Sequence, residues 1–168
     1  MRLILPLVIF VLSAVIGHVF VLTSIPSFIM GKAHQTFEQE GIPLNMFVST
    51  PRQTPQTQRI VRPSPDLAYA ICRFDTTTGP VFINAPLWEG YGSLSIFDAN
   101  TDNVFVADLS TGSTFSGIEV RRPAENSVEG ALKLDGRGLA LIRRLAPTDE
   151  THAEAEALIA GATCAPIG

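Results

Sequence analysis

The first thirty residues of this chain are almost without charge. From Leu3 to Met30 there is no Asp, Glu, Lys or Arg in 28 residues, most of which are Leu, Ile, Val or Phe. The hydrocarbon core of a bilayer is about 30 Å thick, and about 20 apolar helical residues are needed to cross it. A run of this length can therefore span a membrane with some tilt. We expect residues 1–30 to form a transmembrane anchor.

The apolar run also lacks the marks of a cleaved secretory signal. It is longer than the roughly 7–15 residues typical of the core of such a signal. Small residues of an A-x-A-like cleavage site are missing as well, because bulky side chains occupy that region: Val19, Val21, Ile25 and Phe28. Retention as an anchor is favoured and cleavage is the alternative, and both interpretations export the rest of the chain.

Charge around the apolar run predicts its orientation. The α-amino group and Arg2 precede the run, whereas only Lys32 follows it closely. Because basic residues near a span favour the cytoplasmic side, the N-terminus is expected inside. The expectation is a single-pass protein of the inner (cytoplasmic) membrane, with residues 31–168 in the periplasm.

An excess of basic residues is also absent from the exported part. Beyond Lys32 the chain has 10 basic and 16 acidic residues. Nucleic acids and anionic lipid headgroups both select basic surfaces, so neither is an expected ligand.

Catalytic and metal-binding motifs are missing too. The chain contains no G-x-S-x-G, H-E-x-x-H or C-x-x-C sequence and has only three histidines, His18, His34 and His152. His18 lies in the apolar run, His34 close to its end, and His152 in a helical turn where we expect it to be solvated. A non-catalytic protein without a cofactor is therefore favoured.

Two cysteines are present, Cys72 and Cys164. Outside the cytoplasm, paired cysteines tend to form disulfides. A bridge between them would join the last helix to the first strand. Two buried free thiols are the alternative.

The exported part divides into a connector and one domain. Residues 31–65 are expected to continue the membrane helix outward and then to form a Pro-rich linker. From Asp66 to the end, short period-two segments alternate with Gly, Pro, Asn and Asp turns, which predicts an antiparallel meander or sandwich. Thr148 is a plausible N-cap for a final helix, whose apolar stripe would be Ala155, Leu158, Ile159 and Ala162. The expected fold class is mainly β (α+β), with residues 66–168 as one β-rich domain.

Several motifs along this domain resemble one family. In chain order they are Arg62-Pro63-Ser64-Pro65-Asp66, Gly79-Pro80, Phe97-Asp98, Thr101-Asp102-Asn103, the run 139–144, and Thr148-Asp149-Glu150 before the helix. Together they resemble domain of unknown function 1254, over roughly residues 60–165, in the short membrane-anchored form found in bacteria. The resemblance implies a β-rich fold and no established reaction. It also implies a separately encoded membrane protein partner carrying domain of unknown function 1214.

Two places could carry chemistry. Asp98, Asn100 and Asp102 have the alternate spacing of a calcium loop, but Gly and Glu are missing at its other key positions, so an ordinary turn is favoured. Exposed aromatic and acidic side chains suit a sugar or protein ligand. The candidate ligand-binding residues are Arg62, Asp66, Trp88, Glu89, Tyr91 and Asp98. For Trp88 itself, a role as a cap over the core is the favoured interpretation.

Two arginine pairs, Arg121-Arg122 and Arg143-Arg144, lie on predicted strands, so one member of each can face inward. They could clamp an anion, but protection of edge strands is the favoured interpretation.

The functional expectation that follows is a cell-envelope interaction module that binds the bilayer and another membrane protein. The alternative is an exported small-ligand-binding domain or an enzyme of unknown reaction.

Overall fold

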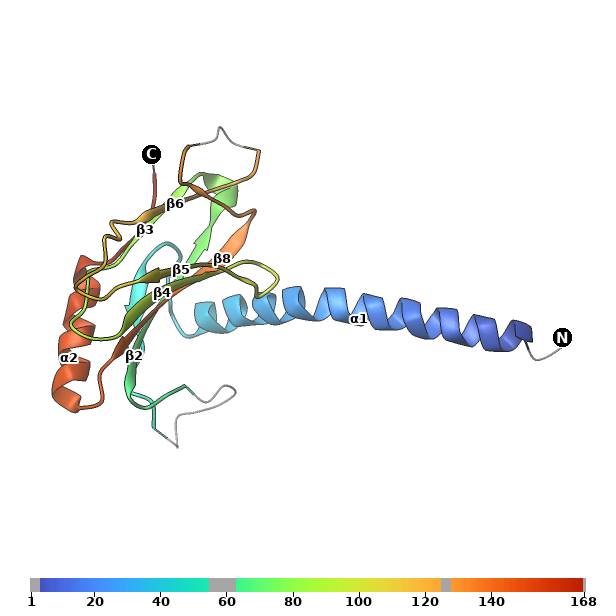
Figure 1. Cartoon of the computed structure of the whole chain (residues 1–168), viewed down its shortest axis with the longest axis horizontal. Helices are drawn as coiled ribbons and strands as arrows, with labels where there is room; N and C mark the ends of the chain where they lie inside the picture. The colour runs from blue at the N-terminus through green and yellow to red at the C-terminus, as the bar shows by residue number, and fades with distance from the viewer. Residues whose placement is uncertain (1–3, 55–62, 125–127, 168) are drawn as a thin grey trace.

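The computed structural model describes residues 4–54, 63–124 and 128–167. It confirms the predicted α+β class: two sheets pack face to face, a long N-terminal helix projects away from them, and a short helix lies at the opposite side (Figure 1). The strands are β1 (Phe47–Ser49), β2 (Leu67–Asp75), β3 (Val81–Asn84), β4 (Gly92–Phe97), β5 (Asn103–Asp108), β6 (Ile118–Arg121), β7 (Leu132–Lys133), β8 (Arg137–Leu145) and β9 (Thr163–Pro166).

Helix α1 (Ile4–Gln39) has 36 residues and is therefore about 54 Å long. Its most apolar stretch has a mean hydropathy of 2.6, and none of that stretch is buried by the rest of the protein. The helix is long and apolar enough to cross a membrane. It continues past Met30 without a break, and Met30 and His34 are buried against the domain.

The larger sheet has the strand order β1-β2-β8-β4-β5 and is antiparallel throughout. The smaller sheet has the order β7-β6-β3-β9, in which β6 and β7 are parallel. The nine-residue strands β2 and β8 pair along their whole length, from Leu67 opposite Leu145 to Asp75 opposite Arg137. Because β8 also pairs with β4, it is the central strand on which the larger sheet is built.

Alternation along the strands places one apolar face of each sheet in a common core. On β2, Ala70, Cys72 and Phe74 are buried in this core, whereas Ile71 and Arg73 point to the other side of the sheet. The core is completed by residues from both sheets, among them Val81, Ile83, Leu94, Ile96, Val120 and Ile142. The outer face of the larger sheet is consequently the surface available to α1.

The C-terminal helix is shorter than its apolar stripe predicted. Helix α2 (Asp149–Ala157) starts at the predicted N-cap, Thr148, but a 3₁₀ turn η2 (Leu158–Gly161) follows, and Ala162 lies outside it. The remaining residues form β9 beside β3, and pairing with that strand satisfies their backbone groups in place of further helical turns. His152 is only 7% exposed and is not solvated as expected, since α2 packs with this face toward the domain.

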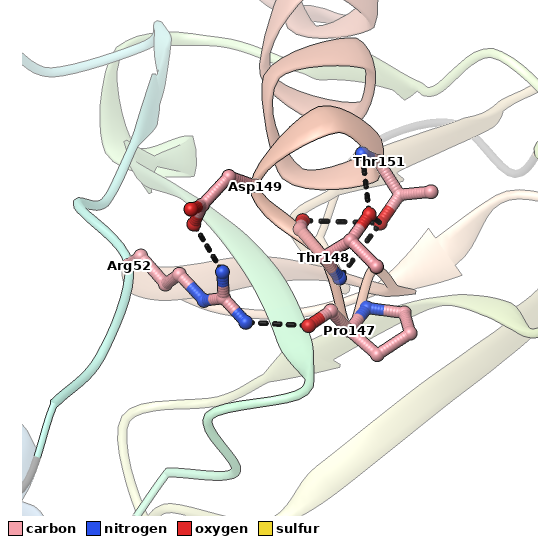
Figure 2. A network of polar contacts seen from close by, with 5 residues as sticks. All are labelled: Arg52, Pro147, Thr148, Asp149 and Thr151. Atoms are coloured by element: carbon pink, nitrogen blue, oxygen red, sulfur yellow. Dashed lines mark hydrogen bonds and ion pairs between the residues drawn. The ribbon is translucent and has the colours of Figure 1, made fainter.

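A polar network holds the start of α2. The Thr148 hydroxyl accepts from the Thr151 backbone N–H at 3.2 Å, while the Thr151 hydroxyl accepts from the Thr148 N–H at 3.1 Å. Figure 2 shows the guanidinium of Arg52 between the carboxylate of Asp149 and the carbonyl of Pro147, donating to both. The segment after β1 is thereby joined to the residues that lead into α2.

Cys72 and Cys164 form a disulfide. The bond joins β2 to β9, so it connects the two sheets and does not attach the final helix to the first strand as expected. Both cysteines are buried in the core, at 0% and 4% exposure.

Candidate functional site

Four of the predicted ligand residues gather at one end of the larger sheet, where β2 and β4 begin and β8 ends. Backbone bonds assemble this end: Ala146 donates to the carbonyl of Asp66 at 2.8 Å, and Leu145 donates to the carbonyl of Tyr91 at 2.8 Å. Trp88 and Glu89 lie in the loop that leads into β4. Arg62 lies outside the described residues.

Trp88 is buried rather than presented to a ligand. Its indole N–H donates to the carbonyl of Leu145 at 3.1 Å, and the ring packs with Ala68, Ala146 and Ala155. Glu89 and Tyr91 are exposed, and the Tyr91 hydroxyl lies 3.2 Å from that of Ser93. Trp88 therefore covers a small apolar cluster beneath α2.

Asp98 lies at the opposite end of the sheet, because β4 ends at Phe97 beside the start of β8. One oxygen of its carboxylate accepts from the backbone N–H groups of Asn100 and Asp102, at 2.8 and 3.0 Å. This is the bonding of an Asx turn. Within residues 4–54, 63–124 and 128–167, no group of three or more His, Cys, Asp or Glu side chains is placed to hold a metal ion.

Arg121, Arg143 and Arg144 lie on interior strands, so the expectation that they protect sheet edges is wrong. Arg122 follows the end of β6. Arg144 points inward and is 1% exposed; its guanidinium donates to the carbonyls of Ala155 and Pro86 at 3.1 and 2.9 Å. Burial lowers the pKa of Arg144. Arg121 forms an ion pair with Glu119 on the same strand. Arg144 thus joins β8 to α2 and to the segment before β4, whereas Arg121 is paired within β6 of the other sheet, so these two arginines form no common anion clamp.

The outer face of the larger sheet carries an apolar groove of about 580 Å³, which we call the outer groove. The end of α1, the end of β1 with the segment that follows it, and the middle of β2 and β8 form its walls. Its apolar lining includes Phe37, Ile42, Val48, Ile71 and Leu141. A polar rim contains Glu40 and Gln53. An open apolar surface of this kind is typical of a contact site for another molecule.

A second, polar cavity of about 440 Å³ lies where α1 meets the end of β2 and the start of β8; we call it the α1 cavity. Arg73, at 7% exposure, donates to the backbone carbonyl of His34 at 2.9 Å and lies 3.8 Å from the carboxylate of Glu38. Arg137 lies 3.5 Å from the carboxylate of Asp75. Gly31, Gln35 and Leu44 complete the lining.

The charges of the α1 cavity are balanced, with two guanidinium groups facing two carboxylates. Burial by itself would raise the pKa of Asp75. The backbone N–H and hydroxyl of Thr77, together with Arg137, outweigh that effect and hold the pKa below its ordinary value. Asp75 is therefore ionised at neutral pH. The cavity can bind a polar or charged group, but its lining contains no Ser or Cys nucleophile.

Sequence reasoning did not identify Arg73, Asp75 or Arg137. One signal was present in the strand pattern: Arg73 shares its face of β2 with Tyr69 and Ile71, and an arginine among apolar residues needs a partner. That partner is on α1, more than thirty residues earlier, and the strand alone does not reveal it.

The chain belongs to the family described as "Protein of unknown function (DUF1254)", whose model matches residues 44–166. Comparison with curated proteins gave no match. Among solved structures, the crystal structure of the VPA0106 protein from Vibrio parahaemolyticus is similar, with a TM-score of 0.62 and 15% sequence identity. The match covers 89% of this chain and 36% of that one, so this chain corresponds to about a third of the longer protein.

Proposed function

We propose that this protein is a non-catalytic docking module of the bacterial cell envelope. It is anchored in the inner membrane by α1, with its N-terminus in the cytoplasm and its sandwich domain in the periplasm. The apolar length of α1 and the basic residue ahead of it support this arrangement.

The junction between anchor and domain favours docking beside the membrane. Helix α1 runs unbroken from the apolar run into the domain, where Met30 and His34 are buried. Arg73 of β2 then bonds to the backbone of the helix. Because the helix is fixed to the sheet, the domain is held at one orientation over the membrane, and its outer groove opens at a fixed height.

The observation that carries the proposal is the outer groove. It is apolar and open in a module that matches only 36% of a longer protein of the same fold. We propose that a separately encoded membrane protein, carrying domain of unknown function 1214, occupies this groove. Burial of its apolar lining would supply the binding free energy.

Site-specific photo-crosslinking in native membranes tests this proposal. A crosslinking residue at Val48, which lines the groove, should capture one membrane protein carrying domain of unknown function 1214. The control carries the same crosslinking residue in place of Glu150, which is exposed at the start of α2. This control should not capture the partner. Equal capture from both positions, or crosslinks to lipid alone from Val48, would refute docking through this groove.

A further inference from the structure

We propose that the α1 cavity binds the headgroup of a phospholipid from the outer leaflet, one in which a phosphate is followed by an ammonium group. The inference rests on the membrane insertion proposed above. It does not depend on the protein partner.

The position of the cavity fits a headgroup. Its lining begins at Gly31, the residue after the apolar run, and reaches Glu38. Seven helical residues rise about 10 Å. The headgroup region on each side of a bilayer is roughly 5–8 Å deep. The cavity therefore starts at the level of the headgroups, and its lining on α1 ends just above them.

The charges of the cavity fit a zwitterion better than a simple ion. The planar guanidinium groups of Arg73 and Arg137 suit phosphate oxygens. The carboxylates of Glu38 and Asp75 lie beside them and suit an ammonium group. A headgroup with only negative charge would be repelled by both carboxylates, and one with only positive charge by both arginines.

Two buried polar atoms beside the cavity support the binding of a hydrogen-bond acceptor there. Among the described residues, neither Nε of Arg73 nor Nε2 of His34 has a hydrogen-bond partner. Both residues line the cavity and are more than nine-tenths buried, at 7% and 4% exposure. A buried polar group without a partner is costly, so a small shift of these side chains that lets a bound phosphate accept from them would relieve the cost.

Lipid retention by the full chain tests the inference. The protein is reconstituted in vesicles with equal amounts of phosphatidylethanolamine and phosphatidylglycerol, extracted in mild detergent, and its bound lipid is measured by mass spectrometry. Phosphatidylethanolamine should be enriched over phosphatidylglycerol. Arg137→Gln and Glu38→Gln should each lower that enrichment about tenfold, the loss expected for one charged hydrogen bond.

Both substitutions suit the test because these side chains are 67% and 75% exposed, so neither change leaves a hole in the core. Arg121→Gln is the control, since Arg121 lies on β6 of the other sheet and should leave lipid retention unchanged. Equal retention of the two lipids, or no loss in either cavity variant, would overturn the inference. Displacement of the lipid by inorganic phosphate would also overturn it, because a bare phosphate site would then explain the binding.

Carbonate extraction of the membranes separates this inference from the proposed anchoring. If the protein is released by carbonate, the membrane insertion of α1 fails, and the lipid proposal fails with it. If the protein stays in the membrane but enriches no phosphatidylethanolamine, only the role of the α1 cavity is refuted.

Discussion

At the scale of single residues, Gly138 lies in one of the most closely packed places described for a glycine of this chain. A Cβ atom added there would lie 2.3 Å from the ring of Phe74 and 2.9 Å from the carbonyl oxygen of Phe97. Phe74 is completely buried in the core, so its ring has no space into which it can move. The position on β8 therefore requires glycine for steric reasons, although its backbone conformation is an ordinary one.

Replacing Gly138 should destabilise the domain strongly. Gly138→Ala is expected to lower the free energy of unfolding by about 2 kcal/mol, as overpacking of a core does. Gly112→Ala is the matched control, because no atom lies within 4 Å of a Cβ added there. Urea unfolding of the full chain in detergent measures both. Equal stability of the two variants would contradict the packing described for β8.

Asp75 should make stability depend on pH. Its pKa is lowered in the folded protein, so its contribution is fully present above the unfolded value of about 3.8 and is lost as pH falls through the folded value. Wild type should therefore melt at a higher temperature than Asp75→Asn at pH 7, and the difference should shrink below pH ~4. Asp135→Asn removes an exposed carboxylate and controls for net charge. A difference that stays constant down to pH ~2 would refute the assignment.

At the scale of elements, helices and strands were predicted most accurately where they depend on residues close together in the sequence. The N-cap of α2 was recognisable because Thr148 and the acids after it act on their own helix. β1 and β9 were not anticipated, since each is a short strand defined by its partner: β1 pairs with β2, and β9 pairs with β3. The periodicity around Ala162 is compatible with a helix, but long-range pairing decides the outcome there.

Removing the cap of α2 should weaken that helix. Thr148→Ala loses the hydrogen bond from the Thr151 N–H and is expected to cost about 1 kcal/mol of stability. Thr111→Ala, at an exposed turn, should have almost no effect and serves as the control. Thermal unfolding provides the comparison, and hydrogen exchange in α2 locates the loss. Unchanged exchange at the start of α2 would argue against the cap.

At the scale of the whole molecule, two long-range connections unite the parts of the chain. The disulfide spans 92 residues and links the two sheets through the core. Arg73 links the larger sheet to α1, and thus the domain to its proposed anchor. Both connections involve β2. Residues of this strand lie in the core and line both the outer groove and the α1 cavity.

Loss of the disulfide should destabilise the sandwich by about 2–5 kcal/mol, mainly because the unfolded chain gains freedom. The double variant Cys72→Ser/Cys164→Ser, and wild type in strong reductant, should both unfold at lower urea concentration than oxidised wild type. Agreement between variant and reduced protein excludes an effect of the serines themselves. If the reduced protein is as stable as the oxidised one, the bridge contributes nothing to the fold.

The amino-acid order by itself determined the properties that depend on neighbouring residues. An uncharged run predicts an apolar helix, period-two segments predict strands, and Thr-Asp-Glu predicts the start of a helix. The tertiary structure decided which distant groups meet: Arg73 with the backbone of α1, Arg137 with Asp75, and Cys72 with Cys164. The first two contacts arise when α1 packs over the outer face and β8 pairs with β2, and the disulfide arises when the two sheets pack face to face; all three depend on the whole packed chain. The outer groove and the α1 cavity therefore became visible only in three dimensions.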